Sequence, residues 1–123
     1  MQGKTLTTPT TVSASKVIGE AVVNRQDESI GEIHELVIDT DSGVIAYAVL
    51  SFGGFLGVGN KLFAIPWRAL ELSPKEMKLI LNVDKEVLKN APGFDKEHWP
   101  NFADRTWGQS IYKYYGYDNY WDL

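Results

Sequence analysis

Short apolar segments separated by turn-forming residues occupy the chain from about residue 13 to residue 83. Their length and their content of β-branched residues are typical of β-strands. Turns are predicted at Asp39–Gly43, where aspartate can bond its own backbone, and at Ser73–Glu76, where proline takes the second position. Five or six antiparallel strands at this spacing predict a mainly all-β fold, a small barrel or a sandwich. The expected strands are Val17–Asn24, Ile30–Asp39, Val44–Leu50, Lys61–Ile65, Glu71–Leu72 and Met77–Leu81.

Three of these strands carry patterns that constrain how the sheet is built. The apolar positions of Ile30–Asp39 fit neither strict alternation nor an amphipathic helix, so we expect a β-bulge near Glu32–Glu35 that restores the register and bends the strand. Val44–Leu50 is apolar on both faces, and we therefore expect it to be covered on both sides. Pro66 cannot donate a ladder hydrogen bond, so the strand before it ends there or lies at an edge, and Trp67–Leu70 is expected to form a helical turn.

The chain changes character from residue 84 onward. Asn82 or Asp84 can cap a short helix at Lys85–Lys89, which Asn90–Gly93 would end. Residues 94–123, called the C-terminal segment below, hold most of the aromatic residues of the chain. A disordered tail would be poor in aromatic residues, so this segment is expected to dock, either on its own barrel or on another subunit. Its rings are Phe94, Trp99, Phe102, Trp107, Tyr112, Tyr114, Tyr115, Tyr117, Tyr120 and Trp121.

The beginning of the chain differs from both of these parts. Residues 1–12 are rich in threonine and lack an apolar stretch, which predicts a disordered N-terminal tail and no signal peptide. The expected organisation is therefore a tail over 1–12, a barrel domain over 13–83, and a helix with an aromatic extension over 84–123. The longest nearly uncharged stretch, Ser42–Asn60, is broken by glycines, so no membrane insertion is expected and the chain is assigned to the cytoplasm.

Composition narrows the function classes. The chain has 123 residues, of which 44% are hydrophobic and 23% charged, and a formal net charge of −4. One globular domain fits these values, and the acidic balance disfavours nucleic acid as a partner because phosphate contacts need clustered lysine and arginine. The absence of cysteine excludes thiolate catalysis and iron–sulfur ligation.

Each candidate for catalysis or metal binding has a structural reading that fits better. His34 and His98 stand far apart, with no zinc-ligand spacing. Asp39–Gly43 opens like a calcium loop, but its glycine comes one position early. Gly54–Lys61 resembles a phosphate-binding loop but precedes a strand rather than a helix. We therefore predict no catalytic residue, no cofactor and no metal site.

Three stretches of the sequence resemble the PRC-barrel family, named from the cytoplasmic domain of the photosynthetic reaction-centre H subunit. The resemblance covers about residues 13–83, and the C-terminal segment is similar to an extension of stand-alone bacterial members. It implies a small, highly bent antiparallel β-barrel that serves as an assembly or regulatory module without a general catalytic motif. A membrane helix like that of the H subunit, or an additional domain like that of a related ribosome maturation factor, is not predicted here. The stretches are Gly31–Asp39, Gly43–Val49 and Gly53–Trp67.

The function expected from these observations is a non-enzymatic, soluble interaction module, which self-associates as a homodimer or binds another protein. A regulatory role is compatible with this expectation. Aromatic enrichment beside few charges is typical of interface cores. Two alternatives remain open: an RNA- or ribosome-associated role, and a small-ligand carrier with a pocket between barrel and tail around His34, Glu35 and Trp67. The residues predicted to make interactions are Phe55, Leu56, Trp67, Trp99, Trp107, Tyr112 and Tyr115.

Overall fold

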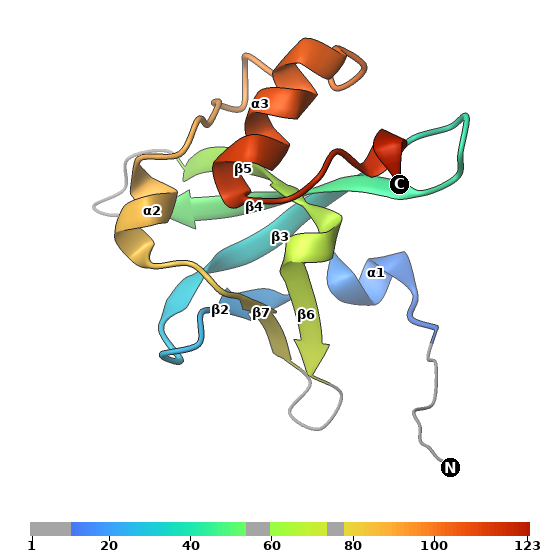
Figure 1. The fold of residues 1–123 in the computed structure, drawn as a ribbon. Helices are drawn as coiled ribbons and strands as arrows, with labels where there is room; N and C mark the ends of the chain where they lie inside the picture. The colour runs from blue at the N-terminus through green and yellow to red at the C-terminus, as the bar shows by residue number, and fades with distance from the viewer. Residues whose placement is uncertain (1–10, 54–59, 74–77) are drawn as a thin grey trace.

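One six-stranded mixed sheet curls into a half-barrel (Figure 1). The computed structural model describes residues 11–53, 60–73 and 78–123. The order of strands across the sheet is β5-β4-β3-β2-β7-β6. The strands are β2 (Ala21–Val23), β3 (Ser29–Ile38), β4 (Ile45–Gly53), β5 (Asn60–Pro66), β6 (Leu70–Ser73) and β7 (Lys78–Leu81).

The expected purely antiparallel sheet is wrong at one pair of strands. β2 and β7 run parallel, with Val22 opposite Leu79 and Val23 opposite Ile80. The physical reason is the corner between β5 and β6, where the 3₁₀ turn η2 (Trp67–Ala69) redirects the chain without a hairpin reversal. β6 therefore runs in the same direction as β5, and the reversal between β6 and β7 leaves β7 parallel to β2.

Several other features of the sheet were correctly expected. The register of β3 against β4 shifts between Ile33 and Glu35, which confirms the bulge near Glu32–Glu35. The helical turn at Trp67–Leu70 is present as η2, and the helix at Lys85–Lys89 is present as α2 behind Asp84. The strand expected at Val17–Asn24 is wrong in its first half, because Ala14–Val17 forms the helical turn α1 and β2 begins only at Ala21.

Hydrophobic clusters lie on both sides of β4, as its doubly apolar pattern predicted. One cluster fills the concave side of the half-barrel and includes Ala48 and Leu50 of β4. The other contains Tyr47 of β4 and the C-terminal residues Ile111 and Tyr112. The C-terminal segment therefore supplies the second cover of this strand.

An unexpected helix, α3 (Arg105–Tyr115), carries that cover, and Figure 1 shows it over β4 and β5. Its N-cap Asp104 accepts hydrogen bonds from the backbone N–H groups of Thr106 and Trp107, and it ends at Gly116 in the left-handed conformation, φ 83°. Before α3, the backbone of Phe94 forms an isolated bridge with Leu62 of β5, through hydrogen bonds of 2.8 and 2.9 Å. Strand β5, at one end of the sheet, is thus covered by a bridge and a helix.

Some predictions concern residues whose structure is not described, namely residues 1–10, the loop residues Phe55 and Leu56, and the turn at Pro74–Glu76. Across the described ranges, no helix is long and apolar enough to cross a membrane.

Candidate functional site

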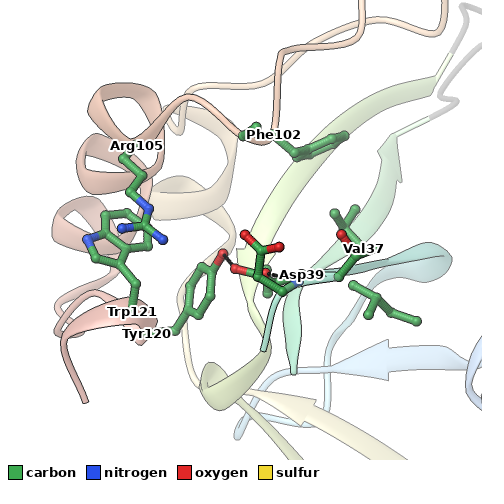
Figure 2. Close-up of a pocket in the computed structure, with 11 residues that line it drawn as sticks. Val37, Asp39, Phe102, Arg105, Tyr120 and Trp121 are labelled. Atoms are coloured by element: carbon green, nitrogen blue, oxygen red, sulfur yellow. Dashed lines mark hydrogen bonds between the residues drawn. The ribbon is translucent and has the colours of Figure 1, made fainter. Parts of the chain in front are cut away.

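A cleft of about 310 Å³ lies where the turn after β3 meets the C-terminal segment. Figure 2 shows side chains from the two regions facing each other across it. The strands contribute apolar surface, and the C-terminal segment contributes three aromatic rings, two of which belong to the 3₁₀ turn η3 (Tyr120–Asp122). These lining residues are Val37, Ile38 and Ala46, with Phe102, Tyr120 and Trp121.

Asp39 is the acidic centre of the cleft and also organises the turn after β3. Its Oδ1 accepts hydrogen bonds from the backbone N–H groups of Asp41, at 2.9 Å, and Ser42, at 3.3 Å. Its Oδ2 accepts a hydrogen bond from the Tyr120 hydroxyl at 2.6 Å, drawn as a dashed line in Figure 2. The sequence reading treated Asp39 as an ordinary turn carboxylate, and the contact with a residue 81 positions away is what that reading missed.

These bonds shift the pKa values of both partners. The Tyr120 hydrogen bond, then the two backbone N–H groups, and more weakly the charge of Arg105 lower the pKa of Asp39 below its usual 3.8. Burial, with the bond to Asp39, raises the pKa of Tyr120 to about 12. Asp39 is therefore ionised and Tyr120 neutral throughout the physiological range, so their hydrogen bond is charge-assisted.

Arg105 and Trp121 form the positively charged side of the cleft, where the charge is that of the Arg105 guanidinium. The guanidinium carbon of Arg105 lies 5.1 Å from the centroid of the Trp121 ring, which is cation–π distance. Arg105 is the first residue of α3, directly after the cap Asp104. The cleft therefore places a cation on an aromatic ring beside an ionised carboxylate.

Comparison with known proteins places the half-barrel in a family. The family model of the PRC-barrel domain matches residues 9–88, well over half of the chain. The chain belongs to the PRC-barrel family. A comparison with curated proteins found no match.

The cleft joins the PRC-barrel match to the sequence that follows it. Asp39 and Asp41 lie inside the matched residues, whereas Phe102, Arg105 and Tyr120 lie beyond them. The expected PRC-barrel resemblance over residues 13–83 is confirmed by this match. Half of the cleft is thus built by the extension rather than by the PRC-barrel domain itself.

The residues predicted to make interactions are distributed between the PRC-barrel and its extension. Trp67 is half-buried against the concave cluster, and Phe55 and Leu56 lie outside the described residues. Trp107 and Tyr112 pack in the cluster around Tyr47, with ring centroids 5.4 and 5.5 Å from that of Tyr47. These two rings hold the extension on its own PRC-barrel in the structure.

Two further predicted residues have different surroundings. Tyr115 packs against both hydrophobic clusters, and its hydroxyl is buried without a hydrogen-bond partner among the described residues. Trp99 is 41% exposed, and its ring lies 6.1 Å from that of His34. A role of these residues toward a partner molecule stays a prediction.

The pocket considered around His34, Glu35 and Trp67 stays a prediction. His34 and Glu35 are exposed on β3, and the ring of His34 lies near that of Trp99, whereas Trp67 packs in the concave cluster. The part of the PRC-barrel that the structure describes holds no group of three or more His, Cys, Asp or Glu side chains placed to bind a metal ion.

Sequence reasoning did not single out Arg105, Tyr120 or Trp121 as site residues. The only available signal was their position in the aromatic extension, which does not reveal that η3 folds back onto the turn after β3. That return is a tertiary contact of high sequence separation, and local patterns do not encode it.

Proposed function

We propose that this PRC-barrel protein is a non-enzymatic, soluble, cytoplasmic interaction module that self-associates through the outer surface of its C-terminal segment. One observation carries the proposal. Most rings of the segment cover the sheet, but Trp99, Tyr114 and Tyr117 keep 38–41% of their surface exposed. Large aromatic side chains are enriched in interface cores and at hot spots, so rings left exposed on an ordered surface favour a protein partner.

The polar groups of the cleft also favour binding over catalysis. Asp39 and Tyr120, which both line the cleft, bond each other. A general acid or base needs a pKa near the working pH, whereas the pKa of Asp39 is lowered and that of Tyr120 raised to about 12. Asp39 and Tyr120 therefore have a structural task and protonation states that do not change near neutral pH.

A symmetric homodimer is the assembly we expect, because such dimers are the commonest oligomers of soluble proteins. Sedimentation equilibrium from micromolar to millimolar concentration tests it. The double variant Trp99→Gln with Tyr117→Gln should shift the equilibrium toward monomer, and it leaves the hydrogen bond of the Tyr114 hydroxyl to the Val87 carbonyl in place.

Leu72→Gln is the matched control for this experiment. Leu72 is 42% exposed, similar to the three rings, but lies on β6, away from the C-terminal segment in Figure 1. It should leave association unchanged. A chain that stays monomeric over the whole concentration range, or a double variant that associates like the native protein, would contradict the proposal.

A further inference from the structure

Arg105 occupies a position that helix electrostatics disfavours. It is the first residue of α3, an 11-residue helix, and the N-terminal end of a helix carries partial positive charge. Within the described part of the chain, Arg105 makes none of the salt bridges. Its position is therefore better explained by the cleft than by the helix.

Two groups in the cleft attract the guanidinium. One is the face of Trp121, 5.1 Å from the guanidinium carbon, and Figure 2 shows the two side chains next to each other. The other is Asp39, which lines the same cleft and whose pKa is lowered mainly by the Tyr120 hydrogen bond and more weakly by the charge of Arg105. An aromatic face combined with carboxylates is the environment in which proteins bind organic cations.

The rest of the lining suits a cation on an aliphatic stem. Asp41 adds a second carboxylate, and its side chain is exposed. Val37 and Ile38 add apolar surface, against which the methylene groups of such a stem can pack. The lining thus holds two carboxylates against one guanidinium, and that guanidinium belongs to a long, flexible and exposed side chain.

We propose that this cleft binds a guanidinium or alkylammonium group, and that Arg105 takes the place of that group on Trp121. An incoming cation displaces Arg105 into solvent and takes over its contact with the ring. The carboxylates of Asp39 and Asp41 belong to the turn after β3, which lines the cleft, and they balance the added charge. Binding is accordingly in competition with the chain's own side chain.

The sharpest test removes the side chain of Arg105, which competes with the incoming cation. The probe is N-acetyl-arginine amide, which has one positive charge and no carboxylate, and the neutral isostere N-acetyl-citrulline amide is its control. Binding is followed by the indole N–H signal of Trp121 in NMR titrations of the full chain. In Arg105→Gln the affinity for the arginine probe should rise about two- to five-fold, the equivalent of one exposed cation–π contact.

Two charge variants locate the site. Asp41→Asn should weaken binding of the arginine probe by a similar factor, because it removes a carboxylate of the cleft. It keeps the backbone N–H group of residue 41, which donates a hydrogen bond to Asp39. Asp118→Asn changes the net charge equally at a residue that does not line this cleft, and it should bind like the native chain. Both substitutions are at exposed positions and leave the packing intact.

The source of the cation is distinguished by a third probe, a peptide with the same arginine between alanine residues. Tighter binding of the peptide than of the amide assigns the cleft to a side chain of a protein, and equal binding assigns it to a small molecule. The proposal is wrong if the citrulline probe binds as well as the arginine probe, if Arg105→Gln lowers the affinity or gives no binding, or if Asp41→Asn and Asp118→Asn behave alike.

Discussion

Two tyrosines on α3 each bury a hydroxyl group, but the surroundings of the two hydroxyls differ. The Tyr112 hydroxyl donates a hydrogen bond of 2.5 Å to the Ala46 carbonyl of β4, whereas the buried Tyr115 hydroxyl has no partner among the described residues. A buried polar group without a partner has lost its hydration without compensation. The Tyr112 hydroxyl is therefore expected to stabilise the folded state, whereas the Tyr115 hydroxyl is expected to destabilise it.

Removal of each hydroxyl separates these contributions. Tyr112→Phe should lower the free energy of unfolding by about 1–2 kcal/mol, because it deletes the buried bond to the Ala46 carbonyl. Tyr115→Phe should leave it unchanged or raise it by up to about 1 kcal/mol. Urea denaturation of the two variants provides the measurement. Equal losses would show that the Tyr115 hydroxyl has a favourable interaction after all.

The bond between Asp39 and Tyr120 makes stability depend on acid. The folded-state pKa of Asp39 is lowered, so its contribution is present above the unfolded value of 3.8 and is lost as the pH falls through the folded value. Asp39→Asn should be less stable than the native chain at neutral pH, and the difference should shrink below about pH 4. Thermal unfolding from pH 7 to 2 measures it. A difference independent of pH would contradict the assignment.

The same hydrogen bond is also lost at alkaline pH, where Tyr120 rather than Asp39 changes its charge. The folded-state pKa of Tyr120 is raised from 10.0 to about 12, so its contribution is complete below pH 10 and is lost as the pH rises through about 12. The native chain should therefore lose stability relative to Tyr120→Phe between these values. Denaturation series at pH 9 to 12 provide the comparison, and parallel pH profiles of the two proteins would rule out this linkage.

At the scale of the element, α3 depends on one small residue for its position on the sheet. A Cβ at Gly108 would overlap the Tyr47 hydroxyl oxygen and would lie 3.1 Å from Cη2 of Trp121. Tyr47 is 1% exposed and packed among four rings, so it has little room to move. The missing side chain lets the helix approach β4 closely.

Gly108→Ala is therefore expected to destabilise the protein although alanine is the better helix former. The gain in helix propensity is about 1 kcal/mol, and overpacking typically costs about 1–3 kcal/mol, so a net loss of about 1–2 kcal/mol is expected. The neighbouring exposed position provides a control, because Gln109→Ala should change the free energy of unfolding little. Urea denaturation compares the two. A stabilised Gly108→Ala variant would show that α3 sits less tightly on Tyr47 than the structure indicates.

The helix also shows where prediction from sequence stops. The strands, the bulge in β3 and the cover on both sides of β4 follow from local patterns of apolar residues. α3 was missed because its rings and Gly108 are poor helix formers, although Asp104 and Gly116 are good caps. The parallel pair β2–β7 and the cleft depend on contacts between distant parts of the chain, which local patterns do not carry.

At the scale of the whole molecule, the C-terminal segment closes surfaces that would otherwise be adhesive. β5 lies at the end of the sheet, where unpaired backbone groups invite other strands. Phe94 pairs with Leu62 of that strand, and the rings around Tyr47 cover the outer face of β4. We therefore expect the segment to stabilise the half-barrel and to keep its edge from pairing with another chain.

Deletion of residues 94–123 tests whether the C-terminal segment protects the β5 edge and the outer face of β4 or is only attached to them. The shortened chain should aggregate or precipitate, because it exposes the edge at Leu62 together with Tyr47, which is 1% exposed in the full chain. Light scattering during expression and refolding measures the outcome. A synthetic peptide of residues 94–123, added during refolding, should restore solubility, because it supplies both the bridge to Leu62 and the rings around Tyr47. The same peptide with Tyr112→Ser should restore less, since it lacks the ring and the bond to Ala46. A shortened chain that stays soluble, folded and unchanged by the peptide would mean that the half-barrel closes its own edge, and the segment would then serve only the cleft and the outer rings.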